Sequence, residues 1–86
     1  MPRYFFHVRM KAGPVIPDRI GIEFRNLAAA RADAVEAVRQ TIAEKKTVGE
    51  DLDFAALEIA DRTGRILSAI EFLDDPSTGS AEPTRQ

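Results

Sequence analysis

Few residues in this sequence could perform chemistry, and His7 is the first of them because it is the only histidine. An imidazole acts as a general base when it lies beside a nucleophile or a second titratable group. The sequence contains no serine-nucleophile motif and no Ser/His/Asp spacing. It has no cysteine, which excludes a disulfide scaffold and a thiolate metal site. We therefore expect no catalytic residue and predict that the protein is not an enzyme.

The acidic run Glu50-Asp51-Leu52-Asp53 comes closest to a metal-site pattern. A calcium loop needs oxygen ligands at alternate positions and a glycine at its sharp turn, and this run does not supply them. It is interpreted as a solvated loop between a helix and a strand. We expect no metal site, no cofactor and no small-molecule substrate.

Basic residues alternate with an aromatic residue and a histidine near the N-terminus. Such a strand is typical of sheets that stack single-stranded nucleic acid bases. The residues concerned are Arg3, Phe5, His7, Arg9 and Lys11. Glutamates on the neighbouring strands would repel phosphates, and a net charge of −2 argues against phosphate binding over the whole surface. Weak nucleic-acid binding is therefore the alternative prediction rather than the first.

The length of 86 residues is enough for one domain and too short for two. The hydrophobic fraction of 44% is ordinary for a globular protein, so a core can form. No apolar run approaches the roughly 20 residues of a membrane span, and the N-terminus lacks the pattern of a signal peptide. We expect a cytoplasmic protein.

Alternation of apolar and polar residues predicts a strand over about 3–10, with Tyr4, Phe6, Val8 and Met10 on one face. A glycine and a proline then supply a turn. Two aliphatic residues at 15–16 are at best an edge strand, because Pro17 interrupts them. After the turn-forming segment 18–21, alternation resumes and predicts a strand over about 20–25.

Asn26 is a good N-cap residue before a run without glycine or proline that predicts a helix over Leu27–Lys46. Gly49 is expected to end it. Arg31 interrupts the apolar stripe, and its side chain is expected to reach the sheet edge or a carboxylate such as Asp18. The stripe comprises Leu27, Ala30, Ala34, Val35, Val38 and Ile42.

Two further strands are predicted over 54–61 and 66–72, the latter with Ile66, Ile70 and Phe72 on one side. The order ββαββ predicts an α+β domain over 1–73, in which one helix covers one face of a four-stranded, mainly antiparallel sheet. The preferred spatial order of the four strands is 2-1-3-4. Residues 74–86 are polar, with proline, glycine and serine, and are predicted to be a disordered tail.

The chain resembles a family of short alphaproteobacterial proteins of unknown function that open with Met-Pro-Arg-Tyr-(Phe/Tyr)-Phe. The matching opening is Met1-Pro2-Arg3-Tyr4-Phe5-Phe6, and the resemblance extends over about residues 1–73. Further matches are Asp18-x-x-Gly21, Ala29-Ala30-Arg31, Leu57-Glu58-Ile59, Asp61-x-x-Gly64-Arg65 and Ile70-x-Phe72. The resemblance implies a ββαββ domain with no assigned activity and no catalytic residues.

One helix cannot cover both faces of such a sheet, so the opposite face must meet water or a partner. We expect an interaction module that contacts protein partners, including a second copy as a homodimer. The contact is predicted on this open face or on the exposed edge strand near residues 20–25. The candidate residues of the open face are Phe5, His7, Arg9, Glu23, Leu67 and Ala69.

Overall fold

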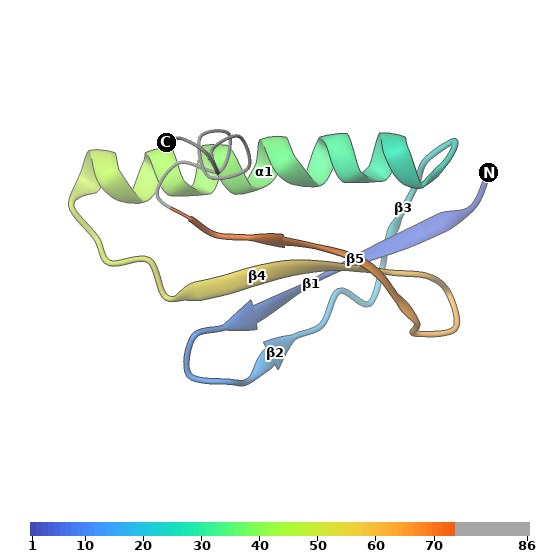
Figure 1. Cartoon of the computed structure of the whole chain (residues 1–86), viewed down its shortest axis with the longest axis horizontal. Helices are drawn as coiled ribbons and strands as arrows, with labels where there is room; N and C mark the ends of the chain where they lie inside the picture. Colours follow the sequence, from blue (N-terminus) through green and yellow to red (C-terminus); the bar gives the residue numbers. More distant parts are fainter. Residues whose placement is uncertain (74–86) are drawn as a thin grey trace, which may run out of the picture.

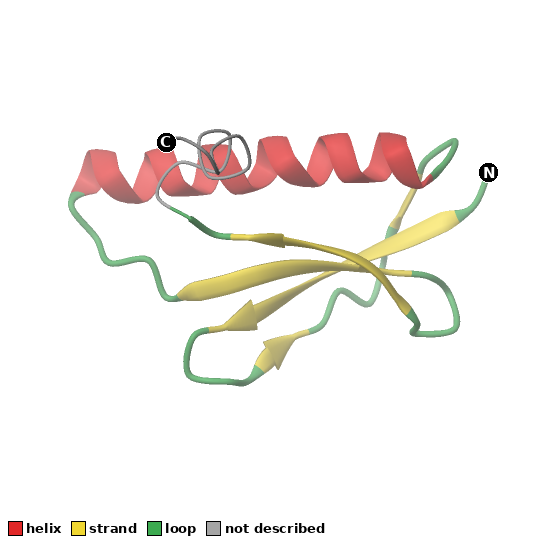
Figure 2. Ribbon diagram, viewed as in Figure 1, coloured by secondary structure: helices red, strands yellow, loops and turns green. Residues whose placement is uncertain are grey.

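The computed structural model describes residues 1–73, in which one helix lies over one face of a sheet (Figure 1, Figure 2). The elements in chain order are β1 (Arg3–Met10), β2 (Val15–Ile16), β3 (Ile22–Glu23), α1 (Leu27–Val48), β4 (Phe54–Ala60) and β5 (Ile66–Glu71). The predicted α+β class is confirmed. The tail predicted over 74–86 lies outside the described residues.

The strands pair antiparallel in the order β2-β1-β4-β5, and β3 also pairs with β1. This agrees with the predicted order, except that the strand expected over 20–25 is only the short β3, and residues 15–16, expected to be at best an edge strand, form β2 on the same side of β1. β2 pairs with β1 at Arg9↔Val15, and β3 pairs with it at Arg3↔Glu23. The two strands are separated at Pro17, which has no amide hydrogen to donate to a ladder.

The helix α1 begins after Asn26, whose side-chain oxygen accepts a hydrogen bond from the Ala29 amide at 2.9 Å. It ends at Gly49, which takes the left-handed conformation with φ 73°. The buried residues of α1 are Ala30, Ala34, Val38 and Ile42, as predicted. Small residues in this stripe let the helix backbone lie close to the sheet.

The core lies between α1 and the inward faces of β1, β4 and β5. Ile59 of β4 and Val38 of α1 are its largest fully buried side chains. Tyr4 of β1 is also buried, and Phe6 stacks on Phe24 with ring centroids 5.8 Å apart. Phe24 lies two residues before the helix cap Asn26, so this aromatic contact ties the start of α1 to β1.

The prediction that Ile66 lies on the same side of its strand as Ile70 and Phe72 is wrong, because those two residues are buried whereas Ile66 is 46% exposed. Ala60 pairs with Ile66, whereas Ile59 pairs with Ser68, so Leu67 is an extra residue between two paired positions. Such a β-bulge shifts the alternation of faces by one residue. Ile66 therefore shares the outer face with Ala60, while Leu67 packs against the core.

The helix does not cover the whole inner face of the sheet. It packs mainly on β4 and β5 and less on β1. Figure 1 shows β2 on the side of the sheet away from α1. The edge at β2 consequently has no helical layer over it, whereas β3 leads up to the start of α1.

Candidate interaction surface

The outer face of the sheet, opposite α1, carries most of the predicted candidates. The strand register places Phe5 opposite Ala60, His7 opposite Glu58, and Ala69 on the other side of Glu58. Directly paired residues share a face, so these side chains form one surface. Ala69 is exposed there, whereas the Glu58 side chain is only 14% exposed.

His7 has a structural contact on this face. Its Nδ1 atom accepts a hydrogen bond from the backbone amide of Asp18 at 3.0 Å. A protonated imidazole has no lone pair on Nδ1, so this contact requires the neutral ring with its hydrogen on Nε2. His7 therefore joins β1 to the loop of residues 17–21 between β2 and β3.

The carboxylate of Asp18 anchors the same loop. One oxygen, Oδ2, accepts from the Phe6 amide of β1 at 3.1 Å. The other, Oδ1, accepts from the amides of Ile20 at 3.0 Å and Gly21 at 3.1 Å. Burial raises the pKa of Asp18, but these backbone hydrogen bonds outweigh it and lower that pKa below its ordinary value. The Asp18 carboxylate thus takes the place of the backbone carbonyl that a neighbouring strand would otherwise offer to the Phe6 amide.

Phe5 is covered by this loop rather than free on the outer face. Gly21 has φ +74°, and a Cβ atom there would lie 2.8 Å from Phe5 Cε2, 2.9 Å from Arg3 Cγ and 2.9 Å from the Tyr4 carbonyl oxygen. Only glycine allows this approach. Arg3 adds a hydrogen bond from Nη1 to the Ile20 carbonyl at 3.0 Å.

The arginines of β1 form ion pairs with glutamates on adjacent strands. Arg9 Nε lies 2.9 Å from Glu58 Oε2, and Arg3 Nη2 lies 3.5 Å from Glu23 Oε2. The structure therefore brings Arg3, Phe5, His7 and Arg9 onto one face, as predicted, but engages each with a neighbouring strand or loop. Lys11 is exposed beyond the end of β1.

Leu67 does not join the outer face as predicted, because the bulge at Ile59/Ala60 turns it toward the core. The sequence offered no signal for this shift, since a bulge adds a residue without changing the apolar pattern. Glu23 is exposed but paired with Arg3. Of the six candidates, Ala69 alone is exposed without a contact described above.

Several exposed aliphatic residues lie elsewhere, on the edge segment. The strand register puts Ile16 and Ile22 on the face of Val8 and Tyr4, and Val15 on the opposite face. The aliphatic side chains of this segment are between 39% and 80% exposed. We call these four residues the aliphatic edge: Val15, Ile16, Ile20 and Ile22. Sequence reasoning named this edge as a second contact site but assigned residue 20 to a turn. The missed signal was the density of aliphatic residues in a segment that also holds turn-forming prolines and a glycine.

Within residues 1–73, no group of three His, Asp or Glu side chains is placed to hold a metal ion. In the acidic run, Glu50 lies 3.2 Å from Lys45 Nζ. No helix of this described part of the chain is long and apolar enough to cross a bilayer.

Comparison with known protein families gives a match over the described residues. A model described as Domain of unknown function (DUF6894) matches residues 3–73, which covers every strand and the helix. No curated protein and no solved structure matches the chain.

Proposed function

The chain belongs to the DUF6894 family, whose function is unknown, and we propose that it is a non-enzymatic interaction module that contacts proteins, including copies of itself. The contact surface is the aliphatic edge. The observation that carries this proposal is the exposure of four aliphatic side chains on one sheet edge, Ile20 being 80% exposed. A bacterial cytoplasm, as expected from the sequence, remains part of the proposal.

Exposed aliphatic residues are common when they are scattered, whereas here four of them follow one another along a single sheet edge, two on its inner face and Val15 on its outer face. Each aliphatic side chain that passes from water into a contact contributes about 1.5–3 kcal/mol. The loop of residues 17–21, which carries Ile20 between the strand residues of the aliphatic edge, is also held in place, since Asp18 and His7 both bond it to β1. A surface already held in place loses little entropy on binding.

The backbone of the edge favours side-chain contact over addition of a strand. Met10 donates its amide to the Pro14 carbonyl at 2.8 Å, which fixes the ladder between β1 and β2. Antiparallel alternation then directs the amide and carbonyl of Ile16 toward β1 and those of Val15 outward. Pro17 has no amide hydrogen to offer. An added partner strand would therefore find only one residue of β2, Val15, whose amide and carbonyl both point outward.

A second copy of the chain is the occupant that we propose first. Two aliphatic edges related by a two-fold axis are complementary because each presents the same apolar side chains. The two nearby carboxylates do not oppose this contact, since Glu23 is paired with Arg3 and Asp18 with backbone amides.

Nucleic-acid binding through the outer face has less support. Arg3 and Arg9 are paired with glutamates, and the Phe5 ring lies against the 17–21 loop. A stacking base would need that ring to be free.

The proposal is tested by sedimentation velocity on the wild type, on the double variant Ile20→Thr, Ile22→Thr, and on Val48→Thr. Threonine keeps the β-branch while it removes apolar surface. Val48 is a matched control, because it is 63% exposed at the end of α1. In a two-fold symmetric dimer both subunits carry the substitutions, so the contact loses the apolar surface of four side chains. The double variant should therefore weaken association by roughly 100-fold or more. A monomeric wild type at high micromolar concentration, or equal effects of all variants, contradicts the proposal.

A further inference from the structure

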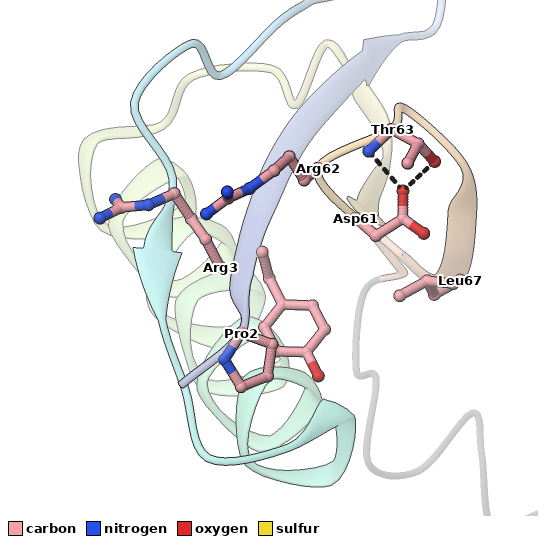
Figure 3. Close-up of a pocket in the computed structure, with 7 residues that line it drawn as sticks. Pro2, Arg3, Asp61, Arg62, Thr63 and Leu67 are labelled. Atoms are coloured by element: carbon pink, nitrogen blue, oxygen red, sulfur yellow. Dashed lines mark hydrogen bonds between the residues drawn. The ribbon is translucent and has the colours of Figure 1, made fainter.

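A separate hollow lies on the β4 side of β1, whereas the aliphatic edge lies along the other side of that strand. It has a volume of about 300 Å³. Pro2, Tyr4 and Leu67 form its apolar wall, and Asp61, Arg62 and Thr63 of the β4–β5 turn form its polar side (Figure 3). This volume is at the lower end of the range of small-ligand sites.

The β-bulge described above is what completes the apolar wall. It takes Leu67 out of the strand alternation and places it in the hollow with Tyr4. Bulges that re-aim a side chain are common beside binding sites. Tyr4 is itself buried in the core, so this wall is fixed.

The polar side is built on a rigid turn. Asp61 Oδ1 accepts hydrogen bonds from the Thr63 amide at 2.9 Å, the Thr63 hydroxyl at 2.6 Å and the Arg65 amide at 3.0 Å (Figure 3). The hydroxyl contact lowers the pKa of Asp61, with the backbone amides adding to it. Oδ1 of Asp61 is thus engaged by the turn, in which Arg62 directly follows it.

The backbone of Arg3 also faces the hollow. Phe24 donates its amide to the Pro2 carbonyl at 3.1 Å, so the groups of Pro2 point toward β3. Alternation along β1 then directs the amide and carbonyl of Arg3 the opposite way. On that side β4 has already ended at Ala60, opposite Phe5. No hydrogen bond from the turn reaches the Arg3 backbone in the described chain.

Three charged residues line this hollow, and Arg3 and Asp61 each have hydrogen-bond partners. The side chain of Arg62 has no hydrogen bond or ion pair within residues 1–73. Figure 3 shows it crossing β1 in the direction of Arg3. Because no ion pair holds it, its guanidinium can turn over the mouth of the hollow. A free guanidinium and a free backbone amide are the donors that a carboxylate accepts from.

We propose that this hollow binds a carboxylate that stands next to a small apolar group. The carboxylate accepts from Arg62 and from the Arg3 amide, and the apolar group lies against Pro2, Tyr4 and Leu67. A free organic acid and the C-terminal residue of a polypeptide both have this chemistry. With so few atoms in contact, the dissociation constant should be about millimolar.

The test is a chemical-shift titration of the full ¹⁵N-labelled chain. The free-acid probe is 4-methylpentanoate, the chain-terminus probe is N-acetyl-leucine, and 4-methylpentanamide lacks the charge. Both acids should shift the signals of Arg3, Tyr4, Thr63 and Leu67, and the amide should not. Tighter binding of N-acetyl-leucine assigns the site to a chain terminus, and equal or weaker binding assigns it to a free acid.

Arg62→Gln should weaken binding of both acids about 3–10-fold. Arg65→Gln, in the same turn but outside the hollow, should leave it unchanged. Both side chains are exposed, so neither change should disturb folding. The proposal is overturned if the amide binds as well as the acids, if Arg62→Gln binds like the wild type, or if no shifts occur at about 20 mM acid. These outcomes do not depend on the aliphatic edge.

Discussion

Replacement of Asp18 by alanine should destabilise the domain more than any other substitution of an exposed or half-exposed carboxylate. Its two oxygens accept three backbone hydrogen bonds, from Phe6, Ile20 and Gly21. Alanine would leave those amides without their acceptor and would release the loop from β1. The loop carries Ile20 of the aliphatic edge and joins β2 to β3, so the change should also weaken any contact made there.

The size of the effect follows from the number and setting of these bonds. A buried hydrogen bond to a charged group contributes about 1.5–3 kcal/mol. Two of the three amides become accessible to water when the loop is released, so the total loss for Asp18→Ala should be about 2–3 kcal/mol. In a domain of this size that lowers the melting temperature by roughly 10–20 °C.

The same residue makes a testable contribution to pH dependence. The pKa of Asp18 is lowered in the folded state, so the unfolded chain binds more protons at acidic pH. Its stabilising contribution is therefore complete above the unfolded pKa, about 3.9, and is lost as pH falls through the lower folded pKa. The difference in stability between wild type and Asp18→Ala should shrink from pH 5 toward pH 2.

Urea unfolding followed by circular dichroism measures both quantities. Asp33→Ala is the matched control, because Asp33 is exposed on α1 and should change stability by less than about 0.5 kcal/mol. Two results would refute the reasoning about Asp18. One is a loss no greater than that of the control, and the other is a difference from wild type that stays constant down to pH 2.

Two further pairs of substitutions test the packing by thermal unfolding. Val38→Asp places an unpaired charge in the core and should prevent folding. Val35 lies at the half-buried margin of the stripe, so Val35→Asp should lower the free energy of unfolding by only about 1–2 kcal/mol. Equal tolerance of the two changes would mean that another face of α1 is buried. Gly64→Ala should lower the free energy of unfolding by about 1 kcal/mol, because of its positive φ alone. Gly21→Ala should lower it by about 3 kcal/mol, because its Cβ would also meet three atoms of β1. Similar losses for the two variants would contradict the close approach of the loop to β1.

The elements of this fold could be predicted from the sequence because each has a strong local cause. Asn26 and Gly49 bound a run with a helical apolar stripe, and alternation defines β1. The order of the strands followed from the requirement that one helix connect antiparallel neighbours. These predictions depend on periodicity and cap chemistry, both of which are properties of short segments.

The contacts of single side chains could not be predicted in the same way. His7 bonds an amide of a loop whose path depends on Asp18, and Asp18 bonds the Phe6 amide rather than Arg31. Arg31 instead donates to Ser68 Oγ at 3.2 Å. Each contact requires the relative placement of two segments, which the composition of neither segment determines.

The candidate surface changed for the same reason. Alternation assigned Leu67 to the outer face, and the bulge reversed that assignment. Phe5 was assigned to the correct face, but the approach of Gly21 to its ring depends on the path of the 17–21 loop. The exposure of Ile20 could be recognised only once that path was known.

The central claim, that the aliphatic edge is the contact surface, is tested most directly by the change of amide chemical shifts with protein concentration. Dilution of the ¹⁵N-labelled chain from millimolar to low micromolar concentration should shift the signals of residues 15–22. The exposed residues of α1 should keep their shifts. Concentration-dependent shifts confined to the outer face around Ala69 and Glu71, or none at all, would contradict the claim.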